Sequence, residues 1–312
     1  RPLVEESRAR RERWRTSRPA VESLAGAATP VREQAVHLGE GGDVHVAIAL
    51  DQNLVEQAPV VLQGIDEGTG RDVRVHVLTR GVPTATVEAW ARAFPRLRLS
   101  HYRFDEVRYG SIARLLAHTT VSTMDRLLLP DVLSDIDRVV YVDIDVAVLG
   151  DVGELWDLDL AGAPLAARTS VSEWAQSGLV LIHRAAARLP AEPALELRAW
   201  MHAQVDGDFP VFNAGVLVLD LARMRADAFT EQVAGMAGRY GLNDQDVLCC
   251  YAAGRAVPLD PRWNVFPNRE TVPDDARLVH YAGGAKPWHP VQLPVKHLWQ
   301  DAQERWLARR PA

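Results

Sequence analysis

The chain has 312 residues, of which 47% are hydrophobic and 24% charged, so it can bury a substantial core in one large domain or two small ones. Its formal net charge of -6 argues against nucleic acid as the main partner, because phosphate backbones are bound by basic surfaces. It has no signal-peptide pattern and no apolar run of about 18 residues, which predicts a cytoplasmic protein. The adjacent Cys249 and Cys250 cannot staple a fold, and we expect them to be small core residues.

The N-terminal segment is basic. Residues 1–18 contain seven arginines against three glutamates. Such an arm can dock onto a partner or attach peripherally to an anionic membrane, although a solvated helix or frayed tail is the simpler expectation. We expect residues 1–42 to form this arm or helix, residues 43–290 the main domain and residues 291–312 a C-terminal helix.

Strand and helix patterns alternate along the chain, which predicts an α/β fold with helices on both faces of a sheet. We expect strands at 44–50, 72–79 and 97–104, helices at 84–94, 193–204 and 296–310, and a mostly helical stretch at 111–133. In the last helix Leu298, Ala302 and Trp306 should face inward. Asp206 and Asp208 are expected in a turn.

Residues 138–148 form an apolar run that carries Asp143 and Asp145. The run predicts a buried strand, and two acids where it ends would be costly to bury without a cation. Residues i and i+2 of an extended strand point to the same side, so these carboxylates can bind one hard divalent metal. The metal would keep open positions for the oxygens of a nucleotide diphosphate. So short a motif also arises by chance, and further evidence is needed.

Two later segments supply that evidence. Residues 211–220 and 278–289 are apolar runs bordered by small and polar residues, among them Asn213, His280 and Lys286. Glycines near that lysine would let backbone amides approach a phosphate, and the lysine adds a point charge. With Leu155-Trp156 and Asn243-Asp244-Gln245-Asp246, the order and spacing of these motifs resemble the family 8 glycosyltransferases from about residue 43 to about residue 300.

The resemblance implies a GT-A type fold, in which a Rossmann-like mixed sheet flanked by helices forms a single domain with a C-terminal helical excursion. It implies a metal held by Asp143, Asp145 and His280, and the imidazole favours manganese over magnesium. The nucleotide and its diphosphate would contact Asp51, Asn53, the backbone at Ile144, Gly283 and Lys286. The donor sugar would contact Arg126, Asn213, Ala214, Gly215, Asp244 and Gln245.

The resemblance further implies a retaining, metal-dependent transfer of a hexose from a nucleotide-diphosphate sugar to a hydroxyl acceptor. An amide is a poor nucleophile, so we expect front-face attack with Gln245 stabilising positive charge electrostatically. Leu54 stands where many relatives stack an aromatic residue on uracil, an interaction of about 1–3 kcal/mol, but a UDP-hexose remains the expected donor. The acceptor could be a glycan, a protein, a lipid or a small molecule.

The acceptor region departs from the family. The loop expected at 163–170 lacks the acid that lipopolysaccharide galactosyltransferases place near Ser170, so lipopolysaccharide synthesis is not assumed. We expect Trp156, Trp263, Trp288 and Phe266 to be packing residues or walls of the acceptor cleft.

Structural explanations compete with these roles. Asn243 or Asp244 can cap a helix that ends near Gly254. Two alternative functions remain open. One is a catalytically silent scaffold that binds a sugar nucleotide, and the other is a phosphatase of the haloacid dehalogenase type. The first should have lost a metal ligand, and the second should carry threonine or valine where this chain has Ala147.

Overall fold

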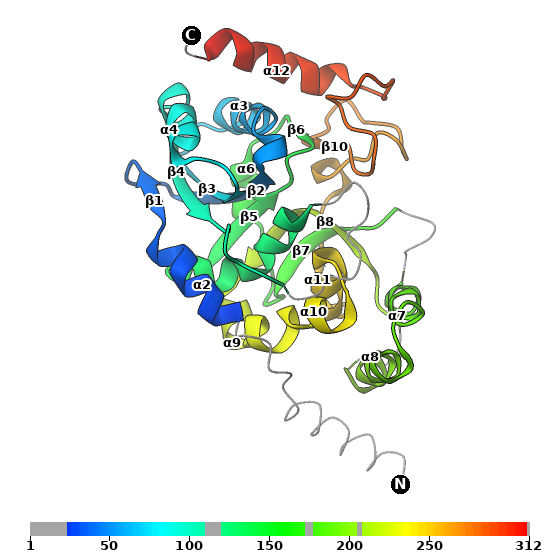
Figure 1. The fold of residues 1–312 in the computed structure, drawn as a ribbon. Coiled ribbons are helices and arrows are strands. Elements are labelled where there is room, and N and C mark those ends of the chain that lie inside the picture. Colours follow the sequence, from blue (N-terminus) through cyan, green and yellow to red (C-terminus); the bar gives the residue numbers. More distant parts are fainter. Residues whose placement is uncertain (1–23, 110–119, 172–176, 205–207, 311–312) are drawn as a thin grey trace, which may run out of the picture.

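The computed structural model describes residues 24–109, 120–171, 177–204 and 208–310, and within these it forms an α/β fold around a mixed sheet (Figure 1). The eight strands of this sheet lie in the order β1-β4-β3-β2-β5-β8-β7-β9. They span Val36–Leu38 (β1), Val44–Asp51 (β2), Val73–Arg80 (β3), Leu97–Arg103 (β4), Arg138–Val142 (β5), Leu165–Thr169 (β7), Phe212–Asp220 (β8) and Val257–Pro258 (β9). A second sheet pairs β6 (Val146–Val148) with β10 (Leu278–His280). The predicted α/β architecture is therefore confirmed.

The direction of the strands changes at the middle of the large sheet. Strands β4, β3, β2 and β5 run parallel to one another, whereas β8 is antiparallel to both β5 and β7. Four strands carry near-continuous buried runs, as expected for strands covered on both faces. The carboxyl ends of β2 and β5 consequently lie beside the beginning of β8.

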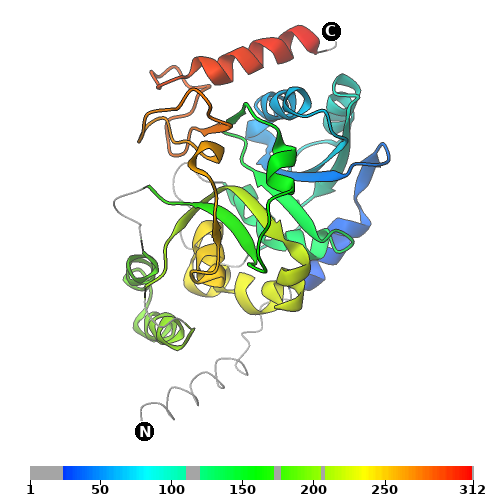
Figure 2. The same cartoon turned by 180° about the vertical axis from the view of Figure 1, so that it is seen from behind.

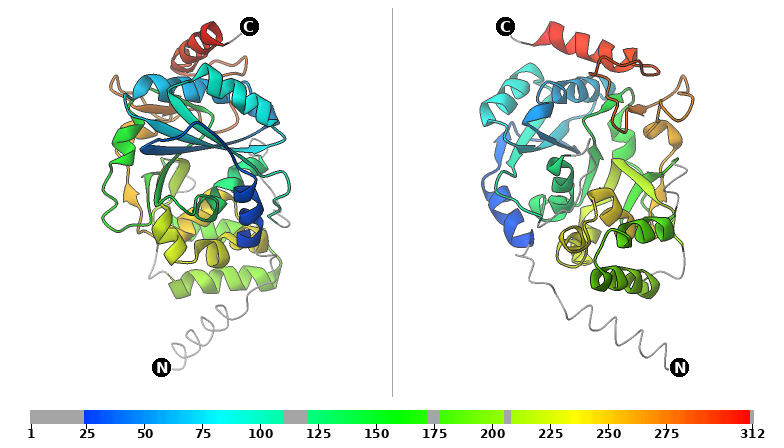
Figure 3. Two further views of the ribbon diagram at one scale, coloured as in Figure 1. Left: turned by 90° about the vertical axis from the view of Figure 1, so that its left-hand side faces the viewer. Right: turned by 45° about the vertical axis from the view of Figure 1, so that its right-hand side comes forward.

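Helices cover both faces (Figures 2 and 3). One apolar core joins the sheet to α3 (Ala58–Gly68), α4 (Thr84–Ala93) and α6 (Val152–Trp156), and α12 (His297–Arg309) packs on α3. The core on the opposite face contains residues from α2 (Leu24–Glu33), α5 (Leu129–Val132), α7 (Gly178–Ala186), α8 (Ala191–Gln204), α9 (Leu221–Ala226), α10 (Met236–Tyr240) and α11 (Asp244–Ala252). Short helical turns lie at η1 (Gln52–Leu54), η2 (Val121–Leu128), η3 (Thr230–Ala234) and η4 (Pro261–Trp263).

The apolar run at 138–148 contains the predicted buried strand, and this strand ends, as expected, where the two acids stand. Strand β5 ends at Val142, the chain turns through Ile144 and Asp145, and β6 continues in the other sheet. The turn is tied on both sides, because the Asp143 amide donates to Gly215 O (2.8 Å) and the Tyr281 amide donates to Asp145 O (2.9 Å). The pairing of β6 with β10 therefore bends the apolar run, and His280 belongs to this small sheet.

Other differences are local. The described part of the expected helical stretch at 111–133 is a 3-10 helix followed by the four-residue α5. The expected loop at 163–170 contains strand β7, because its backbone pairs with that of β8. In α12 the fully buried residue is Trp299, and Leu298 is only partly buried, whereas Ala302 and Trp306 are buried as expected.

The basic arm at 1–18 and the expected turn residue Asp206 lie outside the described residues. Among the residues that the structure does describe, none of the helices has the length and apolar character needed to cross a membrane.

Candidate metal and nucleotide site

A pocket of about 540 Å³ lies where β2, β5 and β8 meet η2, α11 and the segment after β10. It brings together all of the predicted site residues except Asp51. The lining comprises Ala49, Asn53, Leu54, Thr120, Ser122, Thr123, Arg126, Asp143, Ile144, Asp145, Asn213, Ala214, Gly215, Asn243, Asp244, Gln245, His280, Ala282, Gly283, Gly284, Lys286, Trp288 and His289.

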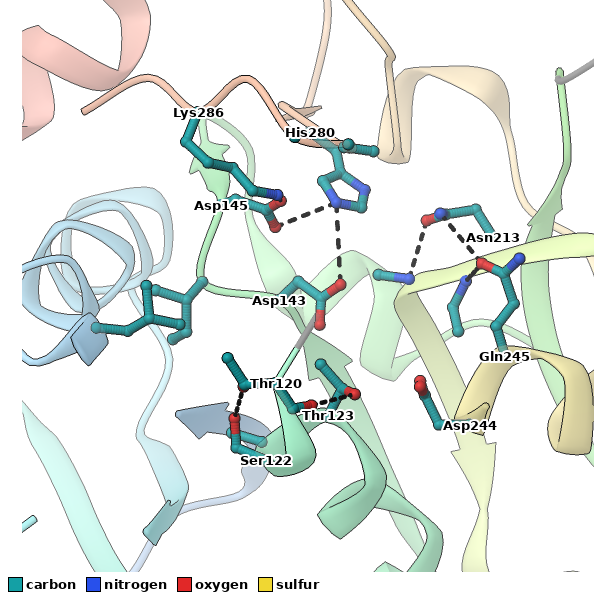
Figure 4. Close-up of a pocket in the computed structure, with 18 of the residues that line it drawn as sticks. Thr120, Ser122, Thr123, Asp143, Asp145, Asn213, Asp244, Gln245, His280 and Lys286 are labelled. Carbon is teal, nitrogen blue, oxygen red and sulfur yellow. Dashed lines mark hydrogen bonds and ion pairs between the residues drawn. The ribbon is translucent and has the colours of Figure 1, made fainter. Parts of the chain in front are cut away.

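Asp143, Asp145 and His280 point toward one another in this pocket (Figure 4). One potential ligand atom from each lies within 4.8 Å of the others. The His280 Nε2 atom is 3.1 Å from Asp145 Oδ1 and 3.9 Å from Asp143 Oδ2. We call these three residues the metal trio, because two carboxylates and one imidazole form a donor set suited to a divalent metal.

Lys286 reaches the metal trio from the segment after β10. Its Nζ donates to Asp145 Oδ2, while His280 contacts the other oxygen of the same carboxylate. Burial alone would raise the pKa of Asp145, but the charges of His280 and Lys286 outweigh it and hold the pKa below its ordinary value. Asp145 is therefore ionised, and Lys286 supplies a cation beside it.

The guanidinium of Arg126 is fixed by contacts with other residues of the protein. Its Nη2 donates to Asp143 Oδ1 (2.8 Å), and its Nε lies 3.1 Å from Asp244 Oδ2. Its Nη1 donates to Ala214 O, and its guanidinium lies 4.1 Å from the centre of the Tyr141 ring. Burial opposes the charge of Arg126, yet the two carboxylates raise its pKa, so it stays protonated. It thus fixes one member of the metal trio relative to α11.

Gly215 leaves room for the metal trio. A Cβ at this position would lie 2.1 Å from His280 Cε1 and 2.9 Å from Asp143 Oδ2. Both distances are far inside van der Waals contact, so the imidazole and the carboxylate lie directly against the backbone of β8. Glycine is needed at position 215 because there is no space for a Cβ, and any side chain would displace His280 or Asp143.

Gln245 lies at the beginning of α11 and faces β8 (Figure 4). Its Oε1 accepts hydrogen bonds from Asn213 Nδ2 (3.3 Å) and from the Ala214 amide (3.2 Å). Asn243 caps the helix by accepting from the Asp246 amide (2.7 Å), which confirms one of the two expected caps. Because capping uses Asn243, the buried Asp244 is free to meet Arg126, and burial raises the pKa of Asp244.

Asp51 is not among the residues that line the pocket. Its Oδ1 accepts from the Asn53 amide (2.9 Å) and so caps η1, which leaves Asn53 and Leu54 in the lining. Its expected contact with a nucleotide stays a prediction.

Several lining residues escaped the sequence analysis. Three of them lie in or next to η2, where neither a motif nor a hydrophobic periodicity indicates a site: Thr120, Ser122 and Thr123. Asn264 also escaped it. This residue is 0% exposed and its Oδ1 lies 2.9 Å from His280 Nδ1, but nothing in its local sequence signals that partner.

Four aromatic residues were expected to pack or to form walls of the acceptor cleft. Of these four, only Trp288 lines the pocket. Trp263 and Phe266 are buried, and Trp156 lies 5.4 Å from His45, ring centre to ring centre.

Comparison with known proteins places this geometry in context. The model of glycosyl transferase family 8 matches residues 45–292. The chain is 27% identical over 217 residues to general stress protein A of Bacillus subtilis (strain 168), and the match covers 62% of this chain and 66% of that protein, just under two thirds. It is 24% identical over 291 residues to probable galacturonosyltransferase-like 6 of Arabidopsis thaliana, covering 82% of this chain and 78% of that protein.

The fold is similar to that of galactosyltransferase LgtC, solved in complex with donor and acceptor sugar analogues. The TM-score is 0.63 at 23% sequence identity, with 85% of this chain and 100% of that chain covered. This similarity confirms the predicted GT-A fold class. The extent of the family match confirms the resemblance seen in the sequence, and the chain belongs to glycosyl transferase family 8.

Proposed function

We propose that the protein is a retaining glycosyltransferase that moves a hexose from a nucleotide-diphosphate sugar, by default a UDP-hexose, to a hydroxyl acceptor. The observation that carries the proposal is the position of the metal trio in a pocket that also contains Asn213, Gln245 and Lys286. The pocket volume of about 540 Å³ lies in the range of small-molecule sites. Family membership and the names of the relatives support a sugar as the transferred group.

The donor set fits a divalent metal. Asp143, Asp145 and His280 would hold it, and the imidazole favours Mn²⁺, with Mg²⁺ as the alternative. Two observations support this fit: one potential ligand atom from each of the three residues lies within 4.8 Å of the others, and Gly215 leaves space for their side chains. When bound, the metal would supply a Lewis acid that stabilises negative charge on the leaving diphosphate.

The protein side chains would divide the remaining work. Lys286 is placed to turn from Asp145 to a phosphate oxygen, since both are anionic partners for its Nζ. Asn53, Leu54 and Ile144 would border the nucleotide, and Gly283 gives the nearby backbone its positive φ of 107°.

The sugar would lie over β8 and α11. Gln245 offers a fixed partial negative charge because Ala214 and Asn213 hold its Oε1, and such a preorganised dipole can offset positive charge developing at the anomeric carbon. Asp244 would accept hydrogen bonds from sugar hydroxyls. The acceptor hydroxyl would attack from the face of the leaving diphosphate, which takes its proton, so that configuration is retained.

The test is release of free nucleotide from a panel of UDP-, GDP- and TDP-sugars, each with and without Mn²⁺. We expect slow hydrolysis of one donor that stops with chelator and in Asp145→Asn. Calorimetry on the same samples separates the alternatives. Metal-dependent nucleotide binding without hydrolysis of any donor would leave a transferase that awaits its acceptor or a silent binder, and no binding at all would refute the proposed site.

A further inference from the structure

We propose that Asn264 is a positioning residue that holds a proton on Nδ1 of His280, leaves Nε2 for the metal, and links this metal ligand to the Asn213–Gln245 pair. The inference rests on the proposed function, because it treats His280 as a ligand of the metal and Gln245 as a neighbour of the sugar. It concerns a residue outside the pocket lining, buried behind the metal trio.

The backbone of Asn264 is held firmly. It follows η4, and its C=O accepts from Arg168 Nη1 (2.6 Å). Arg168 in turn makes a bidentate pair with Glu270, with both N–O distances at 2.6 Å. The next residue, Val265, bridges to β10, where its C=O accepts from the His280 amide (2.8 Å). The side chain of Asn264 is therefore presented to His280 from a fixed frame.

A backbone amide determines which atoms of these side chains donate hydrogen bonds and which accept them. The Gly215 amide can only donate, so the atom of Asn213 that lies 2.9 Å from it must be the oxygen Oδ1. The atom of Asn264 that lies 3.0 Å from this same oxygen must then be the donor Nδ2. The remaining atom, Asn264 Oδ1, faces His280 Nδ1 at 2.9 Å and can only accept. His280 consequently carries a proton on Nδ1.

This proton has a consequence for metal binding. With a proton held on Nδ1, Nε2 is the ring atom left to bind a metal. It faces Asp143 and lies 3.1 Å from Asp145 Oδ1, so in the metal-free protein it donates to that carboxylate and would exchange this proton for a metal. Metal-ligating histidines require that arrangement, and the group that accepts from the other ring nitrogen holds the ring in place. Asn264 therefore prepares His280 as a ligand before a metal arrives.

The second hydrogen bond of the Asn264 side chain orients the residues proposed to contact the sugar. Because Asn264 Nδ2 and the Gly215 amide both occupy Asn213 Oδ1, Asn213 must turn its own Nδ2 toward Gln245 Oε1, 3.3 Å away. The Ala214 amide, another obligatory donor, independently identifies that atom of Gln245 as oxygen. A single buried amide thus orients both a metal ligand and the glutamine beside the proposed sugar position.

Two substitutions separate the two roles. Asn264→Leu is close in size and removes both hydrogen bonds, so we expect Nδ1 of His280 to lose its hydrogen-bond acceptor and Mn²⁺ affinity to fall by about 10–100-fold. Asn264→Asp keeps an acceptor for His280 Nδ1 but sets a carboxylate oxygen against Asn213 Oδ1. Its Mn²⁺ affinity should stay within about threefold of wild type, while kcat falls by about tenfold with little change in the KM for the donor.

The direct readout is ¹⁵N NMR of the histidine rings in metal-free protein, with His280 assigned by the His280→Gln variant. Mn²⁺ affinity is measured separately by electron paramagnetic resonance, and Asn268→Leu and Asn268→Asp are matched controls at an exposed asparagine of the same segment. Melting curves identify variants that do not fold.

A His280 that carries no proton on Nδ1 in the wild-type protein would overturn the inference, and so would a folded Asn264→Leu with an unchanged Nδ1 signal and unchanged Mn²⁺ affinity. Neither result depends on turnover. Absence of transfer in the wild-type protein would instead count against the proposed function, while the ring signals and metal affinity would still decide the role of Asn264.

Discussion

The two ends of the parallel strands both bury polar side chains, but in different ways. The carboxyl ends carry the metal trio. Toward the amino ends of β2 and β3 lies a second cavity of about 440 Å³, lined by a group that we call the amino-end cluster. The cavity lining contributes five of its members, the exposed His37 and the half-buried or buried His45, Arg74, His76 and Tyr102, and the buried Ser100 completes it by bonding to His37 and Arg74.

The members of the amino-end cluster bond mainly to one another. His76 lies between His45 Nδ1 (2.9 Å) and the Tyr102 hydroxyl (3.2 Å), and Arg74 binds two backbone carbonyls and Ser100. The metal trio instead gathers two carboxylates and an imidazole at one point. Burial of polar groups therefore does not by itself indicate a metal or substrate site. The convergence of potential ligand atoms from two carboxylates and an imidazole is the better indication.

The largest expected effect is loss of transfer when the metal trio is changed. Asp145→Asn keeps the shape of the side chain but removes a charged ligand, and we expect the transfer rate to fall by about 10³-fold, equivalent to about 4 kcal/mol. The measurement is the initial rate of nucleotide release at saturating Mn²⁺. The matched change at the other end, His76→Phe, should leave the rate within about twofold, and equal losses in the two variants would break the comparison.

Gly215→Ala should give the next largest effect. The added Cβ would press on His280 and Asp143, so we expect Mn²⁺ affinity to fall by about 10–100-fold. Overpacking should also lower the free energy of unfolding by about 1–3 kcal/mol. Metal titration and urea unfolding measure the two effects. Gly70→Ala is the control, because a Cβ there meets nothing within 4 Å, and indistinguishable results for the two glycines would contradict the packing argument.

The amino-end cluster should matter for stability alone. His76→Phe leaves His45 and Tyr102 without their partner in a buried setting, so we expect the free energy of unfolding to fall by about 1–3 kcal/mol. Urea unfolding measures this change, and Mn²⁺ affinity of the folded variant should equal that of wild type. A selective loss of metal binding in this variant would mean that the two ends are coupled.

The smallest effect is a dependence of stability on pH. Burial, with help from the charges of His45 and Arg74, holds the pKa of His76 well below 6.5, and burial lowers the pKa of His101 to about 4. Below about pH 6.5 the unfolded chain takes up protons that these folded histidines refuse, so stability present above that pH is lost as the pH falls.

Each such histidine should contribute a slope of up to about 1.4 kcal/mol per pH unit in this range. Urea unfolding at pH 7.5, 6.5 and 5.5 measures it, and His76→Phe should have a shallower slope than wild type by about one proton. An unchanged slope would show that His76 is not buried as a neutral ring.

Much of the fold and the metal trio could be predicted from sequence because their signals are local. The apolar runs at β2, β3 and β5 predict buried strands, and Asp143, Asp145 and His280 stand at the borders of such runs. The separate strand β6 after the two acids could not be predicted, since its partner β10 lies more than a hundred residues later in the chain.

Asn264 was missed for a similar physical reason. Its role depends on partners supplied by β8 and β10, and a single asparagine between Trp263 and Val265 has no period or motif that names them. Asp51 stands at a strand end, as a site residue should, and its Oδ1 accepts from the nearest free amide, that of Asn53. Its expected contact with a nucleotide stays a prediction.

The most direct test of the account is Mn²⁺ binding to chelator-treated protein in the presence of UDP, followed by electron paramagnetic resonance. The account predicts about one bound Mn²⁺ per chain in the wild type and in His76→Phe, and loss of that binding in the double variant Asp143→Asn, Asp145→Asn. Equal Mn²⁺ binding by the wild type and a folded double variant, or no binding by either, would contradict it.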